Sequence, residues 1–354
     1  MDQGHFEDGN NINRQYVHRF SVRDGRVRAL MRHAAAVLLA ALHFGAGGAA
    51  TPAWNPERTV EFIVPSSAGG GQDRTARIVQ KIMQDSAVVA SPVNVVNKPG
   101  GSGNIAYHYL SQFSGNAHYL ATATGALLTS HILGTSPLNY TDFTAISVLY
   151  GEYTGFSVNA HSTIQSGKDL VERVKKNPDS ITFAFGTARG APNHIAIALV
   201  MKAAGIDVSK LKVVIYKASV EATTALMGGH VDVVATPIST YLPVLASGKI
   251  RIVAIAAPQR VSGKFAYVPT WREQGFDAIM PSYRMFIAPK GLSSAQVAFW
   301  DKAFASLSQN PLWKKELEQN EWQSNYMNSA DSRKYLDARY EAEHEILVKL
   351  GLAK

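Results

Sequence analysis

The sequence predicts an α/β protein built of two similar lobes, each a mostly parallel sheet with helices on both faces. Short β-branched runs alternate with helical patterns from residue 59 onward, and this alternation is typical of parallel sheets covered by helices. The alternation falls into two series, and a glycine-rich turn opens each of them. The length of 354 residues also exceeds the usual size of a single domain. No low-complexity tract separates the series, so we expect crossing strands to join the lobes as a hinge.

The first 53 residues are not expected to belong to this fold. Residues 31–53, MRHAAAVLLAALHFGAGGAATPA, place one arginine before a short apolar run that is followed by small residues. That layout is typical of a secretory signal, and the apolar run is too short to span a bilayer. We expect cleavage near Ala50 or Ala53, with Met31 as the true start and an exported mature chain.

The first series predicts four strands and two helices. The strands are VEFIV (60–64), VNVVN (93–97), YLATAT (119–124) and AISVLY (145–150). A helix is predicted from Asp73 to Met83, because apolar residues recur on one face. A second helix, 168–176, is expected to end at Asn177-Pro178.

The second series repeats the pattern, and a helical tail follows it. Its strands are ITFAF (181–185), KVVIY (212–216), VDVVA (231–235) and IRIVAIA (250–256). Helices are predicted from 192 to 204 and from 220 to 227. The tail after Pro289 contains three helical patterns, and we expect its aromatic residues to pack on the sheets.

Charge and composition exclude several classes of protein. The formal net charge of +8 falls to +6 without residues 1–53, which carry six Arg and four acidic residues. Lys and Arg are scattered rather than gathered into a basic stripe, so nucleic acid is not an expected partner. A mildly basic exported protein suits the capture of anions. The chain has no cysteine, which excludes disulfides, thiolate metal sites and cysteine nucleophiles.

The first glycine-rich loop lies in FIVPSSAGGGQDRTARIV (62–79), between a strand and a helix. Successive glycines bring bare backbone close to a ligand, and the helix start offers unpaired N–H donors. Asp73 is a candidate N-cap that would satisfy some of these donors itself. A plain tight turn with a cap is the alternative.

The second glycine-rich loop, FGTARGAPNHIAIALV (185–200), repeats this arrangement. Gly186 and Gly190 bracket Arg189, and Pro192 suits the first helical turn. Arg189 could hold a carboxylate through two parallel hydrogen bonds. The alternative is a solvated or lobe-bridging arginine.

Signatures of enzymes and metal sites are weak. NKPGGSGNIA (97–106) imitates a dinucleotide fingerprint, but no acidic residue follows at the distance that a ribose requires. Phosphate-loop and GxSxG motifs are missing from the sequence. The histidines lack zinc-site spacing, so we expect no metal, no cofactor and no catalytic residue.

Several segments together resemble a known family. They are VPSSAGGGQDRTARIV, NKPGGSGNIA, YKASVEATTALMGGHVDVV, GKIRIVAIAAPQR, VPTWREQGF and FIAPKGLS, in this order. Together they resemble the solute receptors of tripartite tricarboxylate transporters, the Bug family, over residues 57–354. The resemblance implies a periplasmic binding protein of the type II class, expected as a monomer. Its two lobes would close on a small organic anion and hand it to the membrane permease subunits.

The resemblance also implies lobe boundaries and a binding site. Lobe one would comprise 57–156 with 280–354, and lobe two 157–279. By position, the ligand-binding residues would be Gly70, Gly71, Gln72 and Asp73 on the first loop, Thr124 and Gly125 after a strand, Thr187, Gly190 and Asn193 on the second loop, and Ser219, which could instead cap the following helix.

Two departures from the family pattern bear on the ligand. Ser66 and Arg189 are two further expected ligand-binding residues. Ser66 stands where the family carries an aromatic residue, which leaves room, and Arg189 stands in a stretch that is normally small and neutral. We therefore expect a dicarboxylate or an aromatic carboxylate. Two other readings stay open: a receptor that presents its ligand to a signalling sensor, and an exported α/β enzyme that uses GGSGNIA for a cofactor.

Overall fold

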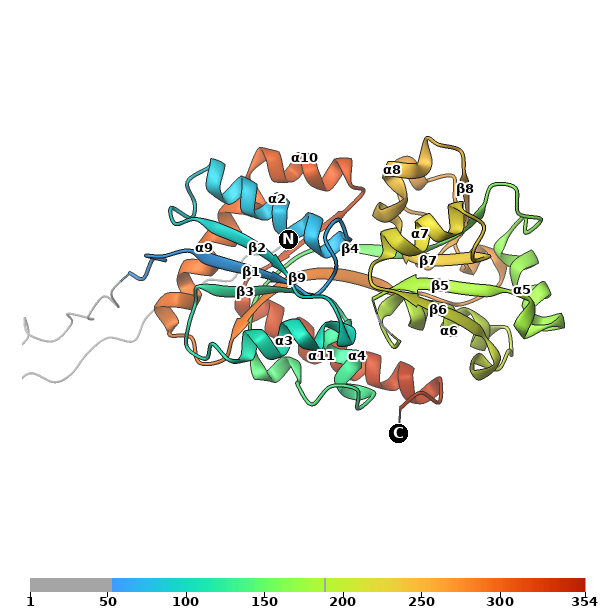
Figure 1. Cartoon of the computed structure of the whole chain (residues 1–354), viewed down its shortest axis with the longest axis horizontal. Coiled ribbons are helices and arrows are strands. Elements are labelled where there is room, and N and C mark those ends of the chain that lie inside the picture. The colour runs from blue at the N-terminus through green and yellow to red at the C-terminus, as the bar shows by residue number, and fades with distance from the viewer. Residues whose placement is uncertain (1–52, 188, 354) are drawn as a thin grey trace, which may run out of the picture. The chain divides into compact units, whose positions relative to one another are not determined.

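The computed structural model describes residues 53–187 and 189–353. Residues 1–52, which hold most of the predicted export signal, lie outside the described residues. One mixed sheet runs through the structure in the order β2-β1-β3-β9-β4-β7-β5-β6, and β8 and β10 also pair with β4 (Figure 1). The strands are β1 (Val60–Val64), β2 (Val93–Asn97), β3 (Tyr119–Ala123), β4 (Phe143–Asn159), β5 (Thr182–Gly186), β6 (Lys212–Tyr216), β7 (Val233–Pro237), β8 (Ile250–Ile255), β9 (Pro281–Pro289) and β10 (Gln323–Met327).

The sheet consists of two halves joined by long strands. In the described part of the chain, β1 pairs in parallel with β2 and β3, and β5 pairs in parallel with β6 and β7. Every antiparallel pairing involves β4 or β9. β4 is 17 residues long; its first part pairs with β9 and β10, and its last part with β7 and β8. The predicted two-lobed α/β class with crossing strands is therefore confirmed, while the lobe boundaries stay a prediction.

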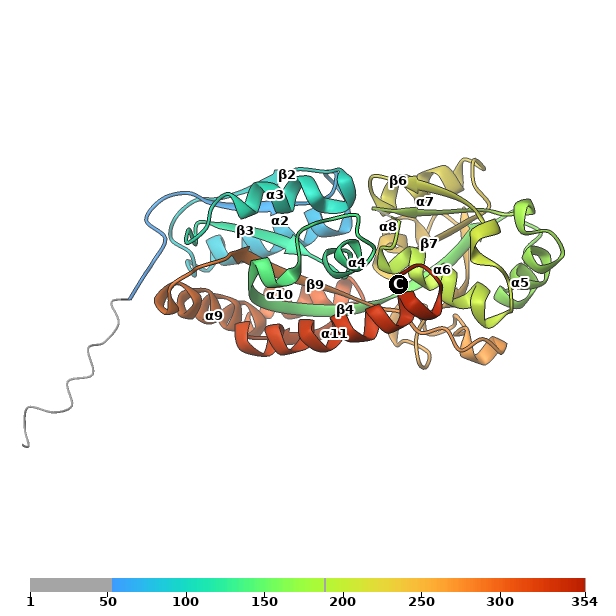
Figure 2. The same cartoon turned by 90° about the horizontal axis from the view of Figure 1, so that it is seen from below.

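Helices cover both faces of the first half (Figures 1 and 2). They are α2 (Gly71–Asp85), α3 (Asn104–Ser111), α4 (Ala126–Ile132), α9 (Ser294–Gln309), α10 (Pro311–Gln319) and α11 (Ser329–Lys349). Side chains alternate along β1: Phe62 belongs to the core that contains Trp300 of α9 and Trp313 of α10, whereas Ile63 belongs to the core that contains Tyr107 of α3. This period of two is what a strand buried on both faces requires.

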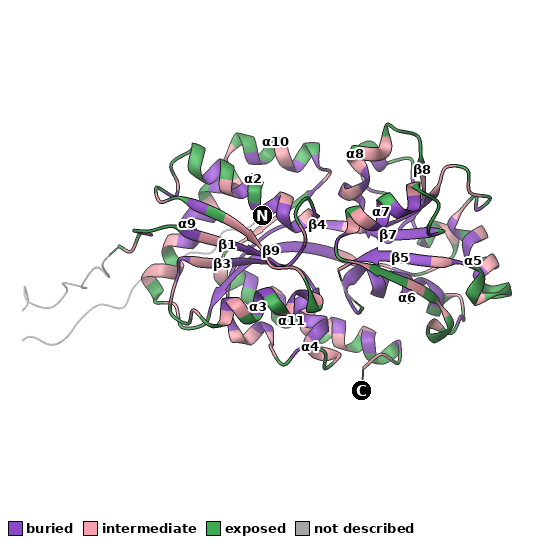
Figure 3. Cartoon of the chain, viewed as in Figure 1, coloured by how far each residue is buried: buried purple, intermediate pink, exposed green. Residues whose placement is uncertain are grey.

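The second half follows the same rule. Its helices are α5 (Gly167–Lys176), α6 (Pro192–Ala203), α7 (Ser219–Met227) and the short α8 (Leu242–Leu245). Phe183 of β5 belongs to the core that contains α6, and Ala184 belongs to the core that contains α7. Figure 3 shows buried residues concentrated along the central strands, with exposed residues on the outer faces of the helices.

The C-terminal helix contacts the cores of both halves. Leu336, near its start, packs with the strands of the first half. Leu347 and Leu350, at its end, pack with Phe183 and Ile195 in the core of the second half. The last turns of α11 therefore lie against the lobe that begins, by our expectation, at residue 157.

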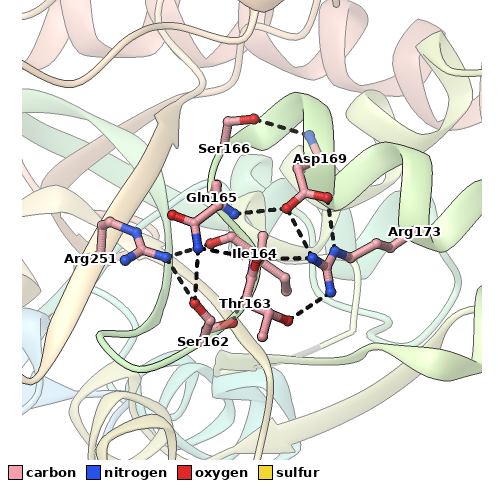
Figure 4. Close-up of polar contacts among 8 residues, drawn as sticks. All are labelled: Ser162, Thr163, Ile164, Gln165, Ser166, Asp169, Arg173 and Arg251. Atoms are coloured by element: carbon pink, nitrogen blue, oxygen red, sulfur yellow. Dashed lines mark hydrogen bonds and ion pairs between the residues drawn. The ribbon is translucent and has the colours of Figure 1, made fainter.

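A polar network fixes the start of α5. This helix lies at the end of the second half that is far from β9 (Figure 1). The Ser166 hydroxyl caps the helix by accepting the Asp169 N–H at 3.1 Å (Figure 4). Arg173 donates to Asp169 at 2.9 Å and to the Thr163 hydroxyl at 2.8 Å. Arg251 donates to the Ser162 carbonyl oxygen at 3.1 Å and to other carbonyl oxygens of the same loop. A helix cap and two arginines thus fix the loop before α5, which forms no strand pairing among the described residues.

Every predicted element is present in the structure, but five strands and α-helices were not predicted, and one strand is longer than predicted. The strands and helices of both series are present within a few residues of their predicted bounds, and the tail is helical apart from β10. β9, β10 and the helices α3, α4 and α8 were not predicted, and the predicted strand 145–150 is only part of β4. Crossing strands change their neighbours along their length, which a local residue pattern does not encode.

Candidate functional site

A small pocket lies where the carboxyl ends of strands from both halves of the sheet meet. Its volume is about 40 Å³. Its lining comes from the segments that follow β1, β3, β5 and β6, from the last residue of β7, and from β9. In open α/β sheets, ligands bind at this edge. We call it the inner pocket; its lining residues are Ser66, Gly70, Gly71, Gln72, Thr124, Thr187, Pro192, Asn193, Ala218, Ser219, Pro237, Ser282 and Arg284.

Three helices begin at the inner pocket. Their N-caps are Gly70 before α2, Ala191 before α6 and Ala218 before α7, and none of the three has a side-chain cap hydrogen bond among the described residues. The first N–H groups of a helix have no intrahelical partner and lie at the positive end of its dipole. Three such ends around one pocket favour an anion. Ser219 is the first residue of α7 rather than its cap, so the capping alternative for Ser219 is wrong.

Asp73 shapes the first loop and does not line the inner pocket. It is the third residue of α2, not the N-cap that we expected, because the helix begins two residues earlier. Its carboxylate accepts from the Gly69 N–H, from Arg77 Nε and from Asn97 Nδ2, each at 2.9 Å. Burial alone would raise the pKa of Asp73. The hydrogen bonds lower it by a larger amount, so the net pKa lies below its usual value. The carboxylate is thus occupied by the loop, by α2 and by β2, and it does not cap the start of the helix at the pocket.

The second loop brings strained backbone to the pocket. Thr187 lines the pocket with a φ of +83°, and its N–H donates to the Tyr216 carbonyl oxygen at 2.9 Å. Left-handed backbone at a residue other than glycine costs free energy and is often found at functional sites. Asn193 is buried, lines the pocket and accepts from the Thr154 hydroxyl at 3.3 Å.

Gly190 and His194 stabilise this loop without lining the pocket. Gly190 has a φ of +81°, and a Cβ there would lie 2.0 Å from Leu133 Cδ1, so any other residue would strain the backbone and displace the Leu133 side chain. Its N–H donates to His194 Nδ1 at 2.9 Å. Burial, together with the positive charge of Arg189, lowers the pKa of His194 to about 4. The imidazole is therefore neutral at neutral pH and serves as a fixed acceptor for the loop.

The structure brings eight of the twelve predicted residues together. Asp73, Gly125, Arg189 and Gly190 do not line the inner pocket. Gly125 is the N-cap of α4, where a Cβ would lie 3.1 Å from Pro192 Cγ and 3.2 Å from Glu343 Oε1. Arg189 is exposed and forms no ion pair with the described residues. The residues that do line the pocket are Ser66, Gly70, Gly71, Gln72, Thr124, Thr187, Asn193 and Ser219.

Sequence reasoning missed the charged residue of the pocket. Arg284 lies on β9, is 7% exposed and lines the pocket with Ser282 of the same strand. Its Nη2 lies 3.3 Å from Glu152 Oε1 on β4. The signal available in the sequence was a lone arginine in the otherwise uncharged segment PSYRMFIAP, a segment that we did not predict to be a strand.

A wider outer pocket of about 220 Å³ adjoins the inner one. Gln72 and Thr187 line both pockets. The outer pocket adds the ring of Tyr107, the exposed Ile215 and Lys217. Together the two pockets offer a narrow polar end and a roomier end with apolar, aromatic and cationic walls.

Other chemistry has little support in the described residues. No group of three or more His, Asp or Glu side chains there is placed to hold a metal ion. None of the described helices combines the length and the apolar character needed to cross a membrane.

Comparisons with known proteins give one consistent result. Residues 75–352 match the family described as "Tripartite tricarboxylate transporter family receptor". The "UPF0065 protein in gbd 5'region" of Cupriavidus necator is 28% identical over 308 residues, which cover 84% of this chain and 89% of that protein.

Solved structures share the fold. The periplasmic binding protein BugD is 25% identical, with a TM-score of 0.77, and the match covers 84% of this chain and 99% of BugD. An R. palustris protein in complex with adipate is 22% identical, with a TM-score of 0.78 over 84% of this chain and 99% of that one.

Proposed function

The chain belongs to the tripartite tricarboxylate transporter receptor family, whose members are solute-binding proteins, and we propose that it captures a small organic carboxylate in the cleft between its lobes. The favoured ligands are dicarboxylates and aromatic carboxylates. The protein would act in the periplasm as a monomer and deliver its ligand to the membrane subunits of a tripartite tricarboxylate-type transporter. Closure of the two lobes about the crossing strands β4 and β9 would retain the ligand.

One observation carries this proposal: the N-termini of α2, α6 and α7, which have no side-chain cap among the described residues, meet at the inner pocket. Their unpaired N–H groups and dipoles create a site for one negatively charged group. Gly71 adds to this, because it lines the pocket without a Cβ that would obstruct a ligand. A carboxylate is the anion of an organic solute that matches such donors in size and charge.

The two-part cleft supports a ligand with more than a bare carboxylate. The inner pocket, at about 40 Å³, holds little more than one such group, whereas the outer pocket, at about 220 Å³, has space for a carbon skeleton or a ring. Tyr107 and Ile215 would contact the apolar body, and Lys217 would attract a second carboxylate. The adipate bound to a protein of the same fold is a ligand of this kind.

The test is a thermal-shift screen of the chain from Trp54 onward, refolded to remove any carried-over ligand. The panel contains succinate, malate, adipate, citrate, benzoate and glutamate, with glucose and NAD⁺ as uncharged and cofactor controls. A ligand at about one hundred times its dissociation constant adds about 2.7 kcal/mol of stability. We expect shifts with carboxylates only. Shifts confined to the sugar or the cofactor, or none across the panel, would overturn the proposal.

A pair of glycine variants locates the binding site. Gly71→Val places two methyl groups in the inner pocket at the first position of α2 and should abolish the carboxylate shift. Gly151→Ala is the control, because a Cβ there comes no closer than 3.6 Å to another atom and Gly151 does not line the pocket. Equal shifts in both variants would place the ligand elsewhere.

A further inference from the structure

We propose that Arg284 is the specificity-determining residue of the cleft, and that it pairs directly with a ligand carboxylate. This inference rests on the proposed function and assigns the charged partner within it. Arg284 is buried on β9 and is the cationic side chain of the inner pocket. Its Nη2 lies 3.4 Å from the point that a Cβ on Gly71 would occupy. The guanidinium therefore borders the space that the missing side chain of Gly71 leaves open, at the start of α2.

The donors of Arg284 are only partly used. Nη1 donates to the Ser282 hydroxyl and to the Tyr283 carbonyl oxygen, each at 3.1 Å. Nε is buried and has no hydrogen-bond partner among the described residues. A guanidinium carries five N–H donors, and Nε–H with the neighbouring Nη2–H forms one edge that fits the two oxygens of a carboxylate. An unpaired donor on a buried cation is costly, so this edge calls for an acceptor.

Glu152 balances the charge of Arg284 but does not satisfy its hydrogen-bond donors. Glu152 lies on β4 and is almost fully buried; its Oε2 accepts a 2.6 Å hydrogen bond from the Ser239 hydroxyl. Its Oε1 lies 3.3 Å from Arg284 Nη2, yet it makes no hydrogen bond among the described residues. The ion pair thus balances the buried charge, while both members retain unused hydrogen-bonding capacity.

A ligand carboxylate at the edge of Arg284 completes this arrangement. It supplies the acceptor that Nε lacks, and the helix starts offset the extra negative charge that it brings next to Glu152. An uncharged analogue such as an amide satisfies fewer donors and gains no attraction from the guanidinium. The site therefore discriminates by charge through one side chain in addition to backbone amides. Arg189, which the sequence suggested for this role, is exposed and does not line the pocket.

The test measures dissociation constants by calorimetry for succinate, malate, adipate, citrate, benzoate and glutamate. Arg284→Met should weaken every carboxylate that the unmodified protein binds at least tenfold. Because this variant leaves Glu152 buried without a counter-charge, the double variant Arg284→Met/Glu152→Met is measured beside it. Replacing both members of a buried pair by apolar residues is often tolerated, so the double variant should fold and still lose affinity.

Glu152→Gln should change carboxylate affinity in the direction opposite to Arg284→Met. It therefore distinguishes an effect on binding from an effect on stability. It keeps the contact with Ser239 but removes the carboxylate that competes for Arg284, so carboxylates should bind several-fold more tightly while the ligand-free protein unfolds more easily. Arg189→Met is the matched control and should leave all dissociation constants unchanged.

The outcomes distinguish this inference from the proposed function. If the unmodified protein binds none of the six carboxylates, the proposed function fails. If it binds them and the folded double variant binds equally well, or if Glu152→Gln weakens binding as Arg284→Met does, then the ion pair is purely structural and the inference on Arg284 is overturned.

Discussion

At the scale of single residues, His194 shows how the cleft depends on a neutral imidazole. Its Nδ1 accepts the N–H of Gly190, and its ring stacks on Phe185 with centroids 5.1 Å apart. Protonation would replace this acceptor with a second donor that faces the Gly190 N–H. Protonation of His194 would therefore remove the acceptor that holds the second glycine-rich loop at Gly190.

This arrangement predicts a pH dependence. The pKa of His194 is about 4 in the folded protein against an ordinary value of 6.5, so the unfolded chain binds more protons between these values. The stability that His194 contributes is therefore complete above about pH 6.5 and is lost as the pH falls toward 4. From pH 7 to pH 5, this loss is about 2 kcal/mol.

Urea unfolding of the ligand-free protein at pH 7 and pH 5 measures it, with His194→Gln as the reference because glutamine can still accept from Gly190. The variant should lose less stability than the unmodified protein over this interval. Glu343 acts in the opposite direction, since burial raises its pKa to about 7 against the lowering effect of Arg339. Its contribution is common to both proteins and cancels in the difference. Identical losses would contradict the prediction.

At the scale of elements, the loop before α5 depends on long-range donors. It joins the end of β4 to α5, and Arg251 of β8 donates to the carbonyl oxygens of Ala160, Ser162 and Ile164. One planar side chain thus replaces the ladder hydrogen bonds that this segment lacks (Figure 4). The network lies in the second half of the sheet and shares no residue with either pocket.

We predict that Arg251→Met lowers the free energy of unfolding by about 1–3 kcal/mol, because it removes the donors of three carbonyl groups. Lys249→Met, at an exposed neighbouring position, is the control and should stay within about 0.5 kcal/mol of the unmodified protein. Chemical denaturation gives both values. Carboxylate affinities should not change in either variant, and a loss of affinity with Arg251→Met would show that the loop is coupled to the cleft.

At the scale of the whole molecule, α11 connects the two halves. It starts against the sheet of the first half and ends in the core that contains α6. Between these ends, Glu343 lies close to Gly125, at a point where Pro192 of α6 also approaches. The helix therefore touches elements on both sides of the cleft, and its packing must be compatible with any movement of the lobes.

Leu347→Ala tests this connection. Leu347 is fully buried, so its truncation should cost about 2–5 kcal/mol, whereas Val348→Ala, at a position 42% exposed, should be nearly neutral. Hydrogen exchange should show the loss of protection in α6 and β5 before α2 and β1, because the deleted methyl groups pack in the second core. Equal loss in both halves would mean that the two cores unfold as one unit.

The sequence alone determined the class of fold, the parallel strands and the two glycine-rich loops. These follow from local patterns: β-branched runs, helical periodicity, and glycines between a strand and a helix. The loops that contain Gly70, Gly71, Thr187 and Asn193 could be placed at the cleft because the carboxyl ends of parallel strands meet at one edge. The individual residues were implied by the resemblance to the receptor family.

Only the tertiary structure decided which arginine reaches the inner pocket. Arg189 and Arg284 are indistinguishable by local pattern, since each is one cation among small or apolar neighbours. Arg284 points into the pocket because β9 crosses between the halves beside β4, and Glu152 on β4 provides the opposite charge that permits its burial. Pairing between strands more than one hundred residues apart is set by the packing of the whole sheet, and no window of sequence contains it.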